Sequence, residues 1–206
     1  MEVEFKTLRE YGVDEFCEKK SRFIGYACPV KTEDEAIKFI AEIKSKHWDA
    51  KHNVYAYCIR ENGIIRFSDD GEPQGTAGMP VLSVIQKEGL TDCVVVVTRY
   101  FGGILLGGGG LVRAYSHASK LALAAAGIVT KKTWSVYKLS ADYTFYAKIE
   151  SIIRDLGGVI ISTDFSENVY IEYRFCDKSE DKFNEKLADL TNGRVKPEFI
   201  EKIISD

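Results

Sequence analysis

Apolar and polar residues alternate along the first part of the chain in a way that predicts a mixture of helices and strands. Behind the capping box Thr32–Glu35, apolar side chains recur at helical spacing as far as His47. The run Val94–Thr98 is apolar on both faces, which is typical of a covered central strand. The pair Asn62-Gly63 is a type I′ hairpin signal. The predicted elements are a helix at 36–47, strands at 54–59, 64–67 and 94–98, a short helix from Pro80, and a long helix from about Leu111 to Ala126.

The C-terminal part of the chain repeats a strand–helix rhythm. Strands are predicted at 135–142, 159–165, 169–175 and 195–200, with helices at 145–156 and around 183–190. This order is βαββαβ, the ferredoxin-like pattern. Because Pro197 has no N–H group, its strand is expected at a sheet edge. Helices and strands mix without strict alternation in the first part, so the fold class is predicted to be α+β.

Composition limits the classes of protein to consider. The 206 residues are 45% hydrophobic and 29% charged, which excludes a disordered chain. No apolar run approaches the roughly 18 residues of a membrane span, and the mixed-charge start predicts no signal peptide. Five cysteines without a C-x-x-C pair indicate reduced thiols in a cytoplasmic protein and no zinc site.

Charge is distributed unevenly along the chain. The formal net charge is −3, which disfavours a strongly basic nucleic-acid protein. Between Cys93 and Ala141, however, there is no Asp or Glu. Such a stretch can present a basic face on a nearly neutral protein. Composition changes near Thr130–Thr133, so we expect one domain at 1–133 and a second at 134–206. The positive residues of the stretch are Arg99, Arg113, Lys120, Lys131, Lys132 and Lys138.

A glycine-rich turn joins the predicted buried strand to the long helix. Its six glycines lie between Arg99 and Arg113. Such a turn can expose backbone N–H groups at a helix N-terminus, where the helix dipole favours anions. The same glycines would also suit a tight turn that packs closely against its neighbours. The sequence supports two interpretations of the glycines, a phosphate site and a tightly packed turn. The glycines are Gly102, Gly103, Gly107, Gly108, Gly109 and Gly110.

Three basic residues follow on the long helix. Arg113, His117 and Lys120 share one face, with no acidic residue between them. A solvated polar face is the ordinary meaning of such a pattern, and phosphate binding is the functional alternative. Tyr100, just before the glycines, is a candidate for stacking on a base.

An acidic segment follows the predicted hairpin. Clustered carboxylates can hold Mg²⁺ or act as acid and base, but Asp side chains in such loops more often bond their own backbone. We favour the capped polar loop and keep open a role in binding a protein partner. The residues of this candidate partner loop are Ser68, Asp69, Asp70, Gly71 and Glu72.

Catalytic and metal-binding patterns are absent from the sequence. There is no G-x-S-x-G or H-E-x-x-H motif, and no close pair of histidines. His47 falls on an apolar helix face and is expected to be a core histidine, and Cys58 a buried thiol rather than a nucleophile paired with His52. No catalytic residue, metal or cofactor is therefore predicted.

Several segments together resemble the IMPACT/YigZ family. The order and spacing of the motifs match across most of residues 15–125, and the C-terminal part resembles the accessory domain of bacterial YigZ members. This chain has Leu105 and Gly108 where some relatives carry a lysine and a small hydroxyl residue. The segments are Lys20–Ile24, His52–Tyr57, Ser68–Pro80, Val97–Gly103 and Gly107–Ser116.

The resemblance implies a fold and a function. The N-terminal domain is expected to be similar to the second domain of a small-subunit ribosomal protein and to the fourth domain of elongation factor G. The C-terminal domain is expected to look like that factor's ferredoxin-like fifth domain. Eukaryotic relatives act in translational control through a ribosome-associated activator of a starvation-responsive kinase. Nucleic-acid or ribosome binding is inferred for bacterial relatives.

The leading hypothesis is a non-enzymatic RNA- or ribosome-associated protein that modulates translation. Phosphates would be contacted by the glycine turn and by the basic residues, Arg99, Arg113, Lys120, Lys131 and Lys132. One alternative is an enzyme that binds a small molecule or nucleotide phosphate at the glycine turn. Another is a protein-binding module that uses the loop 68–78.

Overall fold

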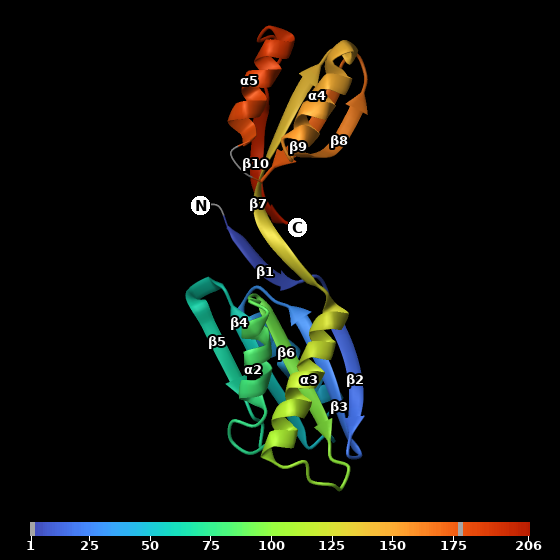
Figure 1. Cartoon of the computed structure of the whole chain (residues 1–206), viewed down its shortest axis with the longest axis vertical. Coiled ribbons are helices and arrows are strands. Elements are labelled where there is room, and N and C mark those ends of the chain that lie inside the picture. The colour runs from blue at the N-terminus through green and yellow to red at the C-terminus, as the bar shows by residue number, and fades with distance from the viewer. Residues whose placement is uncertain (1–2, 177–178) are drawn as a thin grey trace. The chain divides into compact units, whose positions relative to one another are not determined.

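Two compact units make up the computed structural model, which describes residues 3–176 and 179–206 (Figure 1). The first unit is Phe5–Thr130, and the second is Lys131–Asp206 with the chain start through Glu4. Strand β7 (Ile128–Ala141) runs across this division, and the boundary predicted at 133/134 falls inside it. No helix among the described residues is long and apolar enough to cross a membrane.

The first unit is built on a five-stranded antiparallel sheet in the order β2-β3-β6-β4-β5. Its central strand β6 is buried from Cys93 to Arg99, which confirms the prediction of a strand covered on both faces. The strands are β2 (Gly12–Glu18), β3 (Ser21–Pro29), β4 (His52–Ile59), β5 (Ile64–Ser68) and β6 (Cys93–Tyr100).

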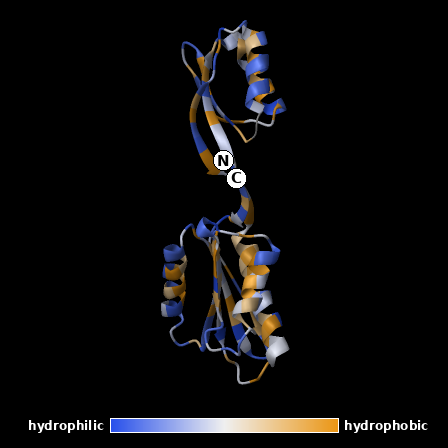
Figure 2. Ribbon diagram, turned by 90° about the vertical axis from the view of Figure 1, so that its left-hand side faces the viewer, coloured by the Kyte–Doolittle hydropathy of each residue, from blue (hydrophilic) through white to orange (hydrophobic). Residues whose placement is uncertain are grey.

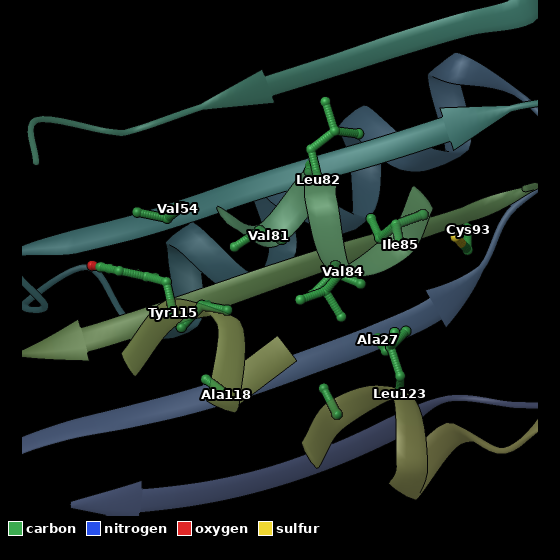
Figure 3. Close-up of a cluster of buried hydrophobic side chains, with 14 of the residues drawn as sticks. Ala27, Val54, Val81, Leu82, Val84, Ile85, Cys93, Tyr115, Ala118 and Leu123 are labelled. Carbon is green, nitrogen blue, oxygen red and sulfur yellow. The ribbon is translucent and has the colours of Figure 1, made fainter. Parts of the chain in front are cut away.

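Helices cover both faces of this sheet (Figure 2). Helix α1 (Glu33–Lys46) packs on one face, and its buried residues share a cluster with alternate residues of β3, β4 and β6. Helices α2 (Gly78–Lys87) and α3 (Gly108–Ala126) pack on the other face. Figure 3 shows side chains of this second cluster, including Val81, Ile85 and Leu123.

Close backbone packing fixes α3 against β2 and β3. A Cβ atom at Gly25 would lie 2.4 Å from the carbonyl oxygen of Ala118, and one at Gly12 would lie 2.2 Å from the amide nitrogen of Ala126. Only glycine fits at such approaches. The glycines and the small side chains of α3 therefore hold the helix on the sheet and set where its N-terminus lies.

The hairpin between β4 and β5 differs in detail from the prediction. The strands are antiparallel, as expected, but Ile59 pairs with Ile64, so four residues form the loop instead of two. Asn62 and Gly63 both have positive φ, 59° and 60°, inside a short 3-10 turn, Glu61–Gly63. The Asn-Gly pair thus correctly indicated residues with a left-handed backbone, but the prediction of a two-residue type I′ turn was wrong.

The second unit has the ferredoxin-like order predicted from the sequence. Strands β10, β7, β9 and β8 pair in this order, all antiparallel, and β1 (Glu4–Leu8) also pairs with β7, so the sheet has five strands among the described residues. Helices α4 and α5 contribute to one apolar cluster with the sheet. Strand β10 begins at Glu198, so Pro197 precedes the edge strand in which it was predicted to lie. The elements after β7 are α4 (Tyr143–Asp155), β8 (Val159–Phe165), β9 (Val169–Phe175), α5 (Ser179–Thr191) and β10 (Glu198–Ser205). The described residues form five α-helices and two sheets, so the chain is α+β, as predicted.

Candidate functional site

One end of the first unit's sheet gathers most of the segments that the sequence singled out (Figure 1). Strand β6 ends there beside the start of β4, with Arg99 paired to His52, and the turn between β2 and β3 lies at the same end. Two connecting loops also lie at this end of the sheet. We call residues 68–78 the acidic loop and residues 101–107, which lead into α3, the glycine loop.

A buried ion pair lies at the centre of this end. Arg99 Nη1 donates to Glu72 Oε1 at 2.6 Å, with side chains only 6% and 4% exposed. The hydroxyl of Tyr115 donates to the same oxygen at 2.7 Å. Burial, and then the negative charge of Glu72, raise the pKa of Tyr115, so its hydroxyl stays protonated and remains a donor. Strand β6, helix α3 and the acidic loop are thereby joined through one carboxylate.

Ser21 ties the glycine loop to the same network. Its hydroxyl oxygen accepts from Arg99 Nη2 at 3.3 Å and from the Gly102 amide at 3.2 Å. Two predictions are corrected here. Arg99 is buried and neutralised by Glu72, so it does not present a charge to phosphate at the surface, and the Gly102 amide is already bonded. Both residues hold the glycine loop in place.

The acidic loop is capped by its own aspartates, as favoured from the sequence. Asp69 accepts hydrogen bonds from the amides of Gly75, Ala77 and Gly78, which begins α2. Asp70 accepts from the Asn53 amide and pairs with Lys44 at 2.7 Å.

Other residues of the candidate partner loop also have structural roles. The Ser68 hydroxyl accepts from the Asp70 amide, and Gly71 has a φ of +85° against the His52 ring. Glu72 is buried, so its place on an exposed partner surface is corrected. No group of His, Cys, Asp and Glu among the described residues is arranged to hold a metal ion.

Tyr100 lies on the α1 face of the sheet, opposite α3. Its hydroxyl donates to Asp49 at 3.0 Å and therefore accepts from His47 Nδ1 at 2.8 Å. His47 Nε2 in turn accepts from the Tyr26 hydroxyl at 2.6 Å, which places the single ring proton on Nδ1. Burial lowers the pKa of His47, which favours this neutral form. His47 is thus a bonded core histidine, as predicted, and the structure does not bring Tyr100 together with the start of α3.

The start of α3 exposes backbone donors. The helix begins at Gly108, three residues earlier than predicted, and no side chain caps it. The first amide to bond back is that of Leu111, to the Gly107 carbonyl. The amides of Gly108, Gly109 and Gly110 have no acceptor among the described residues. They lie at the positive end of the helix dipole. Gly103 and Gly107 adopt positive φ and shape the loop that leads into the helix.

Basic side chains flank this helix start. Lys19, Arg113 and His117 line a cavity of about 260 Å³ together with Gly110, and Glu18 is the one carboxylate in its lining. Lys51 lines a second cavity of about 380 Å³, which Gly107 and Gly108 also border. Lys120 is exposed further along α3.

Lys131 and Lys132 belong to the second unit, where Lys132 lies 3.7 Å from Glu4. Their proximity in the sequence to the basic face of α3 suggested a single patch. Because these lysines belong to the other unit, their place in that patch stays a prediction.

Lys19 and Lys51 were not predicted as site residues. Lys19 and Lys20 form a two-residue turn with φ values of 46° and 65° between β2 and β3. Asn-Gly is the usual sequence signal for such a turn, and a Lys-Lys pair does not predict one. Lys51 stands just before β4, where its position depends on the pairing of β4 with β6.

Comparison with known proteins agrees with this architecture. Residues 19–123 match the model of the Impact N-terminal domain, and residues 139–194 match DUF1949, a domain of unknown function. The chain is 46% identical over 189 residues to the Bacillus subtilis protein named IMPACT family member YvyE, covering 91% of this chain and 87% of that protein. The chain belongs to the IMPACT family. The acidic loop, the glycine loop and the start of α3 lie within the Impact N-terminal match.

Other IMPACT relatives match in whole or in part. IMPACT family member YigZ of Escherichia coli is 34% identical over 89% of this chain and 92% of its own length. Protein IMPACT of Rattus norvegicus is 34% identical, but over 44% of this chain and 30% of its own length. A crystal structure titled as that of a hypothetical protein superposes with a TM-score of 0.61, at 32% identity and 98% coverage of both chains. These names state family membership and name no reaction.

Proposed function

We propose that this IMPACT-family chain is a non-enzymatic RNA- or ribosome-associated protein of the cytoplasm that modulates translation. The observation that carries the proposal is the uncapped start of α3, with three free amides between basic side chains. Backbone donors at a helix N-terminus bind phosphate oxygens, and neighbouring lysines and arginines add the charge that attracts a phosphate backbone.

The charge of this surface is available for a ligand. None of the described carboxylates forms an ion pair with Lys19, Lys51 or Arg113, whereas Arg22, Arg60 and Arg99 are each paired within the unit. A protein of net charge −3 that keeps several cations unpaired around one helix start can attract an anion there. The five free cysteines fit a reducing compartment.

Removal of two cations should weaken RNA binding and reduce its dependence on salt. For Lys19→Ala with Arg113→Ala, we expect about tenfold lower affinity for single-stranded RNA at low salt. The slope of log K against log salt should become shallower by about 1.4, at about 0.7 per lost contact with a single strand. Fluorescence anisotropy at several salt concentrations measures both quantities.

The matched control is Lys38→Ala with Lys87→Ala, which removes two exposed charges from α1 and from the C-terminal end of α2. This control should bind with nearly the wild-type slope. If both double variants lose affinity equally, the effect is one of net charge and the assigned surface is wrong.

Co-sedimentation with separated ribosomal subunits at low and high salt extends the test. We expect salt-sensitive binding to one subunit, which the Lys19 and Arg113 changes weaken.

A further inference from the structure

A cavity beside the phosphate surface could hold a flat organic group. The phosphate surface is the start of α3 at Gly108–Gly110 with the flanking cations Lys19, Lys51 and Arg113. It has a volume of about 380 Å³, near the lower end of the roughly 300–1,000 Å³ of small-ligand pockets. Its lining is mostly apolar, from Phe101, Leu105 and Leu111. Phe101 and Leu105 are 48% and 81% exposed, so the glycine loop presents apolar surface to solvent with nothing covering it.

A buried carboxylate with one free oxygen forms part of the same wall. The side chain of Glu72 is 4% exposed, and both of its hydrogen bonds, from Arg99 and Tyr115, end on Oε1. No described residue donates a hydrogen bond to Oε2. His52 Nε2 lies 3.9 Å from Oε2, beyond hydrogen-bond distance, and the ring is held by its Nδ1–H bond to the Asp70 carbonyl at 2.8 Å. A carboxylate oxygen that has no donor within the protein and lies in a cavity wall can accept an N–H group from a ligand.

Phosphate-binding groups border the cavity as well. Lys51 lines it, and so do Gly107 and Gly108 at the uncapped start of α3. An apolar cavity, a hydrogen-bond acceptor in its wall and cationic groups at its edge are the three elements that recognise a nucleotide: base stacking, base-edge bonding and phosphate binding.

We propose that this cavity holds one unstacked base of single-stranded RNA, with the amino group of the base donating to Glu72. This inference rests on the proposed function, because it assigns a base to a strand whose phosphates lie at the start of α3. A duplex cannot fill the cavity, since its bases are stacked and paired. Adenine, cytosine and guanine present an amino group. Uracil has none, and its one edge donor, N3–H, lies between two carbonyl oxygens that the carboxylate repels, so uracil is disfavoured.

The test uses heptameric uridine RNAs whose central nucleotide is adenosine, uridine or an abasic residue. We expect the adenosine strand to bind about tenfold more tightly than the abasic strand, in the range that one base contributes by stacking. The uridine strand should bind less tightly than the adenosine strand and no more weakly than the abasic one, because uracil can stack but offers no amino group. Binding of adenosine monophosphate is measured as well, to distinguish a site for a free nucleotide from a site for a nucleotide within RNA. We expect adenosine monophosphate to bind far more weakly than the adenosine strand.

A side chain placed into the cavity should abolish the preference for a base. At Gly108 a Cβ atom meets only the Thr76 methyl group, at 3.8 Å, so Gly108→Leu introduces a side chain without strain from a position that borders the cavity. For this variant we expect adenosine and abasic strands to bind alike. Val112→Leu is the control at an exposed position of the same helix, outside the lining of this cavity, and it should keep the preference.

The outcomes separate this inference from the proposed function. If binding depends on salt but is the same for every central base, and Gly108→Leu does not change it, the base site is wrong and the phosphate surface is retained. Absence of binding to every strand overturns both. If adenosine monophosphate binds as tightly as the adenosine strand, the cavity serves a free nucleotide and its assignment to RNA is wrong.

Discussion

Replacement of Glu72 by alanine is expected to lower the free energy of unfolding of the first unit by about 3–5 kcal/mol, the cost of breaking a buried ion pair from one side. The change leaves the Arg99 guanidinium buried without its counter-charge, and it removes the acceptor of the Tyr115 hydroxyl. Urea unfolding measures the loss, and hydrogen exchange of amides in β4 and β6 shows whether it is confined to this unit.

The chain contains a matched control for this prediction. Arg22 and Glu15 also form an ion pair at 2.6 Å, but their side chains are 50% and 49% exposed. Exposed pairs contribute about 0–1 kcal/mol, so Glu15→Ala should cost little. Similar losses from the two substitutions would mean that burial does not set the strength of the Glu72–Arg99 pair. Exchange of both partners for apolar residues should cost less than Glu72→Ala alone, because no buried charge is then left unpaired.

Gly102→Ala should destabilise the protein by about 3 kcal/mol, at the upper end of the cost of overpacking. A Cβ atom at this position would lie 2.0 Å from the backbone carbonyl of Lys20 and 2.5 Å from the Ser21 amide nitrogen. Because backbone atoms cannot move aside as a side-chain end can, the glycine loop must shift and its bond to Ser21 is lost. Urea unfolding and the exchange rate of the Gly102 amide report these effects.

Gly103→Ala separates the steric clash from backbone strain. Gly103 has a φ of +82° and open space around its Cα, so alanine there meets only the strain of a left-handed backbone, about 1–2 kcal/mol. The cost at Gly102 should therefore exceed that at Gly103. The reverse order would show that close packing of the loop against β3 is not what fixes it.

Local patterns were sufficient to predict most of the fold. The doubly apolar run of β6 and the βαββαβ order depend on periodicities of a few residues, and both are present in the structure. The start of α3 was placed three residues late because glycine is a poor helix former, and a helix with three glycines in its first turn has no propensity signal.

The candidate site was less predictable, because its charges are set by contacts between distant segments. A stretch without acidic residues suggested that Arg99 is free, but its counter-ion Glu72 lies 27 residues away and arrives through the acidic loop. Conversely, Lys131 is close to α3 in the sequence but belongs to the second unit. Only the fold brings Lys19, Lys51 and Arg113 to one end of the same sheet.

We propose that RNA phosphates bind at the uncapped start of α3. The most direct measurement is a titration of the ¹⁵N-labelled protein with a single-stranded RNA heptamer, followed by amide chemical shifts. We expect the largest shifts at Gly108, Gly109 and Gly110, with Lys19 and Arg113 next. Shifts concentrated in residues 131–206, with the amides of these glycines unmoved, would contradict it.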